Sequence, residues 1–347
     1  MNSRPLVSIL TPVFNQRAYI RKTLQSVLNQ TYKNWEWIIL DDGSTDDTGD
    51  IIKSAHDSRM RYFYQEHAGI QYLTKTYNKA LSLCKGSYVA MLDHDDYWPE
   101  YKLEVQVKGF DEQDIVLSYG ECVLVNGDGR KMGYLKPPAD VAIAGNNPVG
   151  SALRILIVDR YCFIINSTVM FRKSALLKIG GFVKADGLYH DYPTWVRLSL
   201  EGRFLSHDLC LGYWRRHPSS ISVRNNKEVE LFDSGIEYIR RFIPSNEKKL
   251  RSLGFFFDMD YLEDNWRKRR AEFATYLPYN KTMLMLNLGR FEVAASEFEK
   301  YVRQNPSIKN KIIWSLIKLS GSLHADIVTP LAAFKNLTVG FFTKWPR

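Results

Sequence analysis

The chain has 347 residues, of which 45% are hydrophobic and 24% are charged, and its net charge is +9. This length can form one large or two modest hydrophobic cores, and the composition is that of a folded protein. No dense basic and aromatic patch indicates nucleic acid, so the charge favours an anionic membrane or phosphorylated substrates as partners. The four cysteines lie far apart without a Cys-x-x-Cys spacing, which argues against a disulfide framework or zinc site.

We expect a cytoplasmic protein. The widely spaced cysteines fit a reducing compartment, and the start of the chain lacks the apolar core of a signal peptide. No uninterrupted apolar stretch is long enough to span a bilayer.

Strands and helices are predicted to alternate over the first part of the chain. Apolar runs predict strands at 6–10, 35–40 and 60–64, and apolar residues at helical spacing predict helices near 20–28 and 74–83. This order implies an α/β fold with a parallel sheet that carries helices on both faces. The first strand is followed by neither Gly-x-Gly-x-x-Gly nor a Walker motif, which argues against a dinucleotide or P-loop site.

The fourth predicted strand, residues 88–92, ends directly in Asp93, Asp95 and Asp96. A continuous apolar run of this length suits a strand covered on both faces, and ligands of open α/β sheets bind beyond the carboxyl ends of such strands. Three adjacent carboxylates favour Mg²⁺ or Mn²⁺ shared with a substrate phosphate. The Asp-x-Asp pattern alone is weak evidence because residues 258–260 also match it, and an acidic turn is the alternative.

The second strand also runs into acidic residues. Ser44 or Thr45 is a candidate N-cap for the next helix, with Asp46 and Asp47 in its first turn. Asp42 precedes the cap at the strand end, so it is the better candidate for a ligand contact.

Further elements are predicted up to residue 200. Asn-Gly followed by Gly at 126–129 is typical of a hairpin turn. We expect the hairpin at 115–136 and a loop that shapes the pocket at 137–152. A strand is expected at 167–172, and helices are expected at 173–179 and 193–200.

Four segments, 7–15, 26–32, 41–46 and 85–96, together resemble family 2 glycosyltransferases with the GT-A fold. They follow the family's order and spacing, and the resemblance covers about residues 5–222. It implies an inverting sugar transfer from a nucleotide-diphosphate sugar, most often a UDP-sugar, to an acceptor hydroxyl. The acceptor is expected to be a glycan or lipid-linked glycan in surface polysaccharide or glycoconjugate synthesis.

The resemblance implies that Thr11, Pro12 and Phe14 line the nucleotide pocket and that Asp42 hydrogen-bonds the base. The segment from Gly69 to Asn78, which follows strand three, is longer than the family's common form. Lys75 in this segment is therefore interpreted as a solvated helix residue rather than a phosphate ligand.

For the acids, the resemblance implies that Asp93 or Asp95 faces the ribose and diphosphate, and that Asp95 or Asp96 holds Mn²⁺ or Mg²⁺. Arg216 and His217 lie in a segment that resembles the one closing the donor site. Arg216 would neutralise phosphate charge, and His217 would bind the metal or the diphosphate. The alternative for His217 is a structural role.

Residues 190–197 resemble the family's acidic pair ahead of an apolar helix, in which the second acid is the catalytic base. That acid corresponds to Asp191, while His190 stands where the family usually has Glu. The alternative is that Asp191 caps a helix in which Pro193 takes an early position, and the two roles are compatible.

Helical patterns replace strands beyond residue 222. We expect a catalytic domain at 1–222 and a helical region at 223–347 that contacts a membrane or a partner. Residues 286–306 resemble part of a tetratricopeptide repeat, but one partial copy is not an array, so we predict a helical hairpin. The expected helices lie at 226–242, 245–254, 260–275 and 281–304.

Residues 308–347 contain six Lys or Arg residues and one acid among apolar residues. Such a segment can form a basic amphipathic helix on the anionic inner face of the cell membrane. It can equally pack against its own domain with its lysines in water.

Two other functional classes are compatible with the sequence. One is a catalytically silent sugar-nucleotide-binding scaffold that acts through its helical region. The other is a metal-dependent nucleotidyltransferase, although residues 11–17 are not the Gly-rich basic loop that such enzymes use. The sequence favours a metal-dependent hexosyl- or N-acetylhexosaminyltransferase over both.

Overall fold

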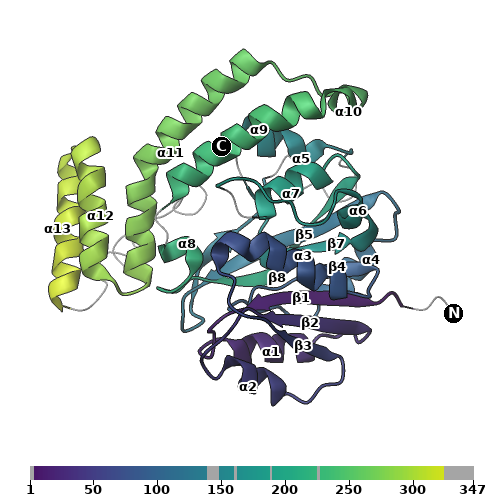
Figure 1. The fold of residues 1–347 in the computed structure, drawn as a ribbon. Helices are drawn as coiled ribbons and strands as arrows, with labels where there is room; N and C mark the ends of the chain where they lie inside the picture. The colour runs from purple at the N-terminus through teal and green to yellow at the C-terminus, as the bar shows by residue number, and fades with distance from the viewer. Residues whose placement is uncertain (1–3, 139–147, 160–161, 188–189, 225–226, 324–347) are drawn as a thin grey trace. The chain divides into compact units, whose positions relative to one another are not determined.

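The computed structural model describes residues 4–138, 148–159, 162–187, 190–224 and 227–323. In this part of the chain an eight-stranded sheet has the order β3-β2-β1-β4-β7-β5-β6, with β8 paired to β5 (Figure 1). The chain divides into two compact units. The first comprises 1–124, 134–215 and 233–257, and the second comprises 125–133, 216–232 and 258–347. The expected domain boundary at residue 222 stays a prediction.

The first four strands confirm the predicted alternation. Strand β1 is parallel to β2 and β4, and β2 is parallel to β3. Because the strand order runs outward to β3 and then returns to β4, right-handed crossovers place α1 and α2 on one face and α3 on the other. The bounds are β1 Val7–Val13, α1 Ile20–Leu28, β2 Trp35–Asp41, α2 Thr48–Lys53, β3 Met60–Tyr64, α3 Leu73–Leu83 and β4 Tyr88–Met91.

Later strands extend the sheet in the opposite direction. Strand β7 is antiparallel to both β4 and β5, and the predicted hairpin of β5 and β6 is present. Helix α7 begins two residues earlier than predicted. Residues 139–147 of the expected pocket-shaping loop lie outside the described residues. The bounds are α4 Lys102–Gly109, β5 Ile115–Val125, β6 Lys131–Leu135, α5 Ser151–Leu153, β7 Met170–Arg172, α6 Lys173–Lys178, α7 Asp191–Leu198 and β8 Arg203–Arg215.

Alternating side chains of the strands build the core. Val7, Ile9 and Val13 of β1 point to one face, as the two-residue period of a strand requires, and pack with Ile20 and Leu24 of α1. The same cluster includes Tyr88, Ala90 and Leu92 from the β4 segment. Strands β1 and β4 are parallel neighbours in the centre of the sheet. The loops that follow them therefore lie at the same end of the sheet.

A buried carboxylate connects the first four strands near their amino-terminal ends. Glu36 of β2 accepts hydrogen bonds from Ser8 Oγ at 2.7 Å, from the Lys85 amide and from Arg61 Nη1 at 2.9 Å. Burial by itself would raise the pKa of Glu36, but these hydrogen bonds lower it below its usual value. The clamp connects β1, β2, β3 and the residues that enter β4.

Helices α11 and α12 form the predicted helical hairpin, but two predicted boundaries are wrong. Helix α11 continues through Pro278, and the expected helix at 281–304 is interrupted after Asn287, where Gly289 takes a φ of 68°. Gly adopts this backbone conformation without steric cost, so the chain can turn there. Proline removes one backbone hydrogen bond, and burial of Met283 and Leu286 against α12 outweighs that loss.

The remaining helices are α8 Ile221–Arg224, α9 Glu228–Ser245, α10 Glu247–Ser252, α11 Met259–Asn287, α12 Phe291–Gln304 and α13 Ile308–Leu323. None of the helices in the described residues combines the length and the apolar character that crossing a membrane requires. The predicted basic segment at 308–347 is described only as far as Leu323.

Candidate active site

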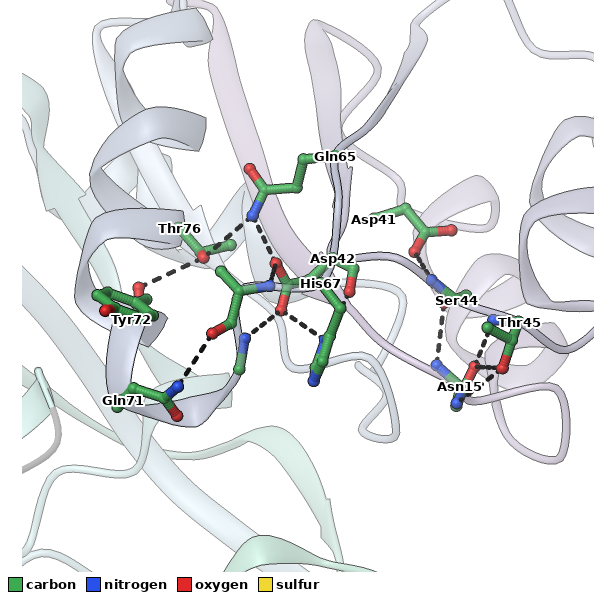
Figure 2. A network of polar contacts seen from close by, with 12 residues as sticks. Asn15, Asp41, Asp42, Ser44, Thr45, Gln65, His67, Gln71, Tyr72 and Thr76 are labelled. Atoms are coloured by element: carbon green, nitrogen blue, oxygen red, sulfur yellow. Dashed lines mark hydrogen bonds and ion pairs between the residues drawn. The ribbon is translucent and has the colours of Figure 1, made fainter.

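The loops that follow β1 and β2 are joined by hydrogen bonds (Figure 2). The Asn15 amide donates to Ser44 Oγ at 2.9 Å, and the Thr45 amide donates to Asn15 Oδ1 at 2.8 Å. The prediction that Ser44 or Thr45 caps α2 is therefore wrong, because both residues form hydrogen bonds with Asn15 instead. The Thr48 amide at the start of α2 donates to Asp46 Oδ1 at 3.0 Å instead.

Asp42 lies just beyond β2 and is almost fully buried. Its Oδ1 accepts from Gln65 Nε2 at 2.5 Å and from the Ala68 amide at 3.1 Å. Its Oδ2 accepts from the Gly69 amide at 3.2 Å and lies 3.1 Å from His67 Nδ1. The predicted base-binding carboxylate is thus held by the segment that follows β3.

The other residues predicted to line the nucleotide pocket follow β1 or end it. The Phe14 ring is partly exposed and stacks on His67 with a centroid separation of 4.0 Å. Thr11 is buried, and its Oγ1 accepts a hydrogen bond from Trp37 Nε1 at 2.9 Å. The Pro12 carbonyl lies 3.0 Å from His94 Nδ1. Phe14 thus has a partly exposed aromatic ring, whereas Thr11 contacts β2 and Pro12 contacts the turn after β4.

Asp93, directly beyond β4, is the centre of a cluster of carboxyl groups. Tyr77 of α3 donates its hydroxyl to Asp93 Oδ1 at 2.7 Å. Burial, followed by repulsion from Asp95, raises the pKa of Asp93 to about 6, and Asp191 contributes in the same direction. Burial, followed by the charges of the same three acids, raises the pKa of Tyr77 well above its usual value. Asp191, although it lies far along the chain, therefore belongs to the same charge cluster as the acids after β4.

Asp96 has a different environment from its neighbours. It is 1% exposed, and its Oδ1 accepts from the Arg215 amide at 2.8 Å while Oδ2 accepts from Ser167 Oγ. Burial and the charges of Asp95 and Asp93 raise its pKa well above the usual value. Both oxygens of Asp96 are used to join β8 and residue 167 to the turn after β4.

Asp191 is the first residue of α7, and its Oδ1 accepts from the Tyr192 amide at 2.8 Å. His190 occupies the cap position without a capping hydrogen bond from its side chain. The His190 ring is 2% exposed, lies 3.9 Å from the Tyr77 ring centroid and, among the described residues, has no hydrogen-bond partner for either nitrogen. A neutral ring at this position adds no further negative charge to the carboxyl cluster.

Two predicted donor-site residues belong to the second unit. His217 is fully buried and its Nδ1 lies 2.8 Å from Ser219 Oγ, while the Arg216 amide donates to the Val125 carbonyl at 2.8 Å. Their roles toward a donor stay predictions. Lys75 is exposed on α3, with its Nζ 4.9 Å from the Tyr72 ring centroid. That it does not bind a phosphate stays a prediction.

No group of three or more His, Cys, Asp or Glu side chains in the described ranges is arranged to hold a metal ion. Mg²⁺ and its close relative Mn²⁺ are commonly bound by one or two protein carboxylates and completed by substrate phosphates and water. The crowded and partly buried Asp93 and Asp95 fit that kind of site, because a cation would offset their mutual repulsion.

Sequence reasoning missed Tyr77 and His67. Tyr77 reads as an apolar position of α3, and only the packing of α3 on β1 and β2 brings its hydroxyl to Asp93. His67 lies in a loop with no periodic pattern. Its one sequence clue is its place between β3 and Gly69, just before the segment that is longer than the family's common form.

Comparisons with known proteins identify the family. The model for glycosyl transferase family 2 matches residues 8–180. WfaP of Escherichia coli, a UDP-Glc:alpha-D-GlcNAc-diphosphoundecaprenol beta-1,3-glucosyltransferase, is 33% identical over 65% of this chain and 82% of its own length. TuaG of Bacillus subtilis, whose name assigns it to teichuronic acid biosynthesis, is 42% identical over 66% of this chain and 86% of its own. The chain therefore belongs to glycosyltransferase family 2, as the motifs indicated.

A solved structure supports the fold. Residues 1–349 of TarS from S. aureus, in complex with UDP-GlcNAc, align with a TM-score of 0.57 over 92% of this chain and 93% of that one. The identity is 16%, so the similarity concerns the fold alone. Together with the sheet topology, it confirms a GT-A-like fold for this glycosyltransferase.

The neutral His190 generates a pH prediction. Burial lowers the pKa of His190 to about 3, from an ordinary value of 6.5. Between pH 6.5 and about pH 3, His190 takes up a proton in the unfolded chain but not in the folded one. The free energy of unfolding therefore decreases as the pH falls below 6.5. This loss amounts to about 2 kcal/mol between pH 7.5 and pH 5, and His190→Gln is expected to abolish it.

Urea unfolding of both proteins at the two pH values measures the effect. The opposite contribution from the raised pKa of Asp93 is present in both proteins and cancels in the difference. A gap between wild type and His190→Gln that is independent of pH would contradict the burial argument.

Proposed function

We propose that this protein is an inverting glycosyltransferase that moves a sugar from a nucleotide-diphosphate sugar to an acceptor hydroxyl. One observation carries the proposal: Asp191 and Asp95 both lie close enough to Asp93 and to Tyr77 for their charges to act on these two groups. A candidate base and the candidate donor-binding acids, which are about one hundred residues apart in sequence, share one site. That arrangement suits an enzyme rather than a silent donor-binding scaffold.

The chemistry follows from this arrangement. An alcohol is a poor nucleophile near neutral pH, so the Asp191 carboxylate accepts its proton as the acceptor oxygen bonds to carbon one of the sugar. The bond from carbon one to the diphosphate oxygen breaks on the opposite side, which inverts the configuration at that carbon. Carbon one gains positive character during the transfer, and the nearby acids favour that charge.

Asp95, with Asp93 beside it, is the proposed holder of Mn²⁺ or Mg²⁺, and the bound ion would neutralise charge on the departing diphosphate. Asp96 is proposed to support the turn, because its oxygens already accept from Ser167 and the Arg215 amide. Arg216 and His217 remain the proposed contacts of the diphosphate or the ion.

The donor is proposed to be a UDP-sugar that carries a hexose or N-acetylhexosamine. Two similar proteins support this choice: WfaP is named for transfer from UDP-Glc, and the TarS structure contains UDP-GlcNAc. The acceptor is proposed to be a lipid-linked glycan, since the name of WfaP gives a diphosphoundecaprenol acceptor. Together with the name of TuaG, this supports a role in bacterial surface polysaccharide synthesis.

Helix α13 supports contact with the membrane that would carry such an acceptor. Four exposed aliphatic residues lie at intervals of four, seven and four along it, which places them within about 60° of one another on the helix. The helix contains three lysines and no acid. The opposite apolar side, including Ile317, packs against α12, so the exposed stripe is additional to that packing. We propose that the stripe contacts the anionic inner face of the cell membrane. Its residues are Ile308, Ile312, Leu319 and Leu323.

Asp191→Asn is expected to leave UDP-sugar binding intact and to lower turnover by about 10²-fold or more, because the amide cannot accept the proton. Release of UDP in the presence of acceptor measures turnover, and calorimetry measures binding. Asp186→Asn, at an exposed acid on the same segment, is the matched control. Normal turnover by Asp191→Asn would refute its role as the base.

Asp95→Asn is expected to abolish the stabilisation of the protein by UDP that depends on Mn²⁺, because the ion loses its proposed ligand. Thermal unfolding with UDP, with and without Mn²⁺, measures the effect. Asp260→Asn, in the second Asp-x-Asp sequence, should keep the stabilisation. Loss of the Mn²⁺ effect in Asp96→Asn and not in Asp95→Asn would transfer the ligand role to Asp96.

The double variant Ile312→Asp/Leu319→Asp is expected to bind vesicles that contain phosphatidylglycerol about 10-fold or more weakly than the wild type, because it places charge in the apolar stripe. Co-sedimentation measures the binding. Val293→Asp, at an exposed apolar residue of α12, is the control and should bind as the wild type does. If the wild type does not sediment with these vesicles, the proposed membrane contact is wrong.

A further inference from the structure

Phe14, which the family resemblance assigns to the nucleotide pocket, carries a ring of the protein itself on one face. The imidazole of His67 stacks on Phe14 with the centroids 4.0 Å apart and the planes 18° from parallel. Two stacked rings are already in contact at this separation, and a base inserted between them would need about 7 Å. On this face of Phe14, a base and the present position of His67 therefore exclude each other.

The same imidazole also takes up the hydrogen-bonding capacity of Asp42. Its Nδ1 lies 3.1 Å from Asp42 Oδ2 and 2.8 Å from the Asp42 carbonyl oxygen (Figure 2). Both neighbours are acceptors, so Nδ1 carries the hydrogen and donates. Gln65 and the amides of Ala68 and Gly69 supply three further donors. An ionised carboxylate has about four acceptor positions. Gln65 and the two amides use three of them, and His67 Nδ1 lies beside the fourth while it donates to the Asp42 carbonyl.

Of these four donors, His67 is the one that can leave most easily. The amides of Ala68 and Gly69 belong to the main chain, and Gln65 also lies 2.8 Å from Lys79 Nζ through its Oε1. The His67 side chain, by contrast, is 48% exposed. Rotation about its side-chain bonds can move the ring into water without moving the backbone that holds Asp42.

We propose that His67 occupies the place of the donor's base in the ligand-free protein, and that the base displaces it. We take the base, uracil in a UDP-sugar, to stack on Phe14 and to donate an N–H to Asp42, the residues that the family resemblance assigns to the nucleotide. The imidazole makes the same stack and donates its N–H to the Asp42 carbonyl, with Nδ1 3.1 Å from Oδ2 of the carboxylate. The exchange replaces one N–H donor beside Asp42 with another, and the three donors from Gln65 and the two amides hold the buried carboxylate in both states. This inference rests on the proposed nucleotide-sugar function and adds a residue that sets donor affinity.

Gly43 makes the arrangement possible. It has a φ of 82°, and a Cβ at this position would lie 2.6 Å from the His67 amide nitrogen. Only glycine lets the segment of His67 approach the turn after β2 this closely. The loop is therefore built to bring His67, and not only the amides that follow it, against Asp42.

The test is calorimetric titration of the full chain with UDP in the presence of Mn²⁺. Competition by His67 lowers the apparent affinity by the fraction of molecules in which the base site is open. His67→Ala is expected to bind UDP about three- to tenfold more tightly than the wild type. Glu66→Gln, at the exposed neighbour of His67, should leave the affinity unchanged. Unchanged or weaker UDP binding by His67→Ala would overturn the proposal.

Inorganic pyrophosphate with Mn²⁺ separates displacement by the base from a general change in the loop. Pyrophosphate has no base, so His67→Ala should not bind it more tightly than the wild type. An equal gain for UDP and pyrophosphate would show that His67 acts on the phosphate region, and the proposal would fail.

Nuclear magnetic resonance tests the position of the ring directly. In the ligand-free wild type, the Phe14 ring current should displace the His67 ring-proton resonances, and saturating UDP should move them to the positions of an exposed histidine. Resonances that stay unchanged while UDP binds would refute displacement and leave the proposed function standing. Failure of both proteins to bind any nucleotide would refute the proposed function together with this inference.

Discussion

Repulsion between carboxylates at the end of β4 is the constraint on which the site depends. Burial and proximity raise the pKa of Asp93, and Asp95 and Asp191 both contribute. The chain limits this repulsion with uncharged groups: Tyr77 donates to Asp93, and the neutral His190 packs against Tyr77. A divalent cation and its diphosphate partner would complete the balance. The electrostatics of the protein alone therefore already favour the ligands of the proposed reaction.

Hydrogen bonds at both ends of the parallel strands position this cluster. At one end, Glu36 connects the first four strands through buried hydrogen bonds and so sets where each strand ends. At the other end, Asp96 connects β8 and residue 167 to the turn after β4. Neither carboxylate needs to touch a substrate for this role. The position of Asp93 and Asp95 depends on both clamps, which links the stability of the fold to the geometry of the site.

The base region and the acidic cluster follow the same principle. A buried carboxylate without donors is costly, so the protein supplies its own partners. Around Asp42 these partners include the half-exposed ring of His67, which stacks on Phe14. A base that brings its own N–H would supply a donor beside Asp42 in place of the one that leaves with that ring. Donor affinity then depends on how well the base competes with a side chain of the same loop.

The sequence by itself determined the local order of the fold and the identity of most site candidates. Two-residue and 3.6-residue periods predict the strands and helices from β1 to β4, and the acids that follow β2 and β4 mark the end of the sheet where a ligand is proposed to bind. These features depend on residues close together in the chain. Three features were decided only by the tertiary structure. Asp96 is buried and hydrogen-bonded to Ser167 and the Arg215 amide, Asp191 lies near enough for its charge to act on Asp93, and α11 continues through Pro278. Each of these depends on burial and partners distant in the sequence, which local patterns do not encode.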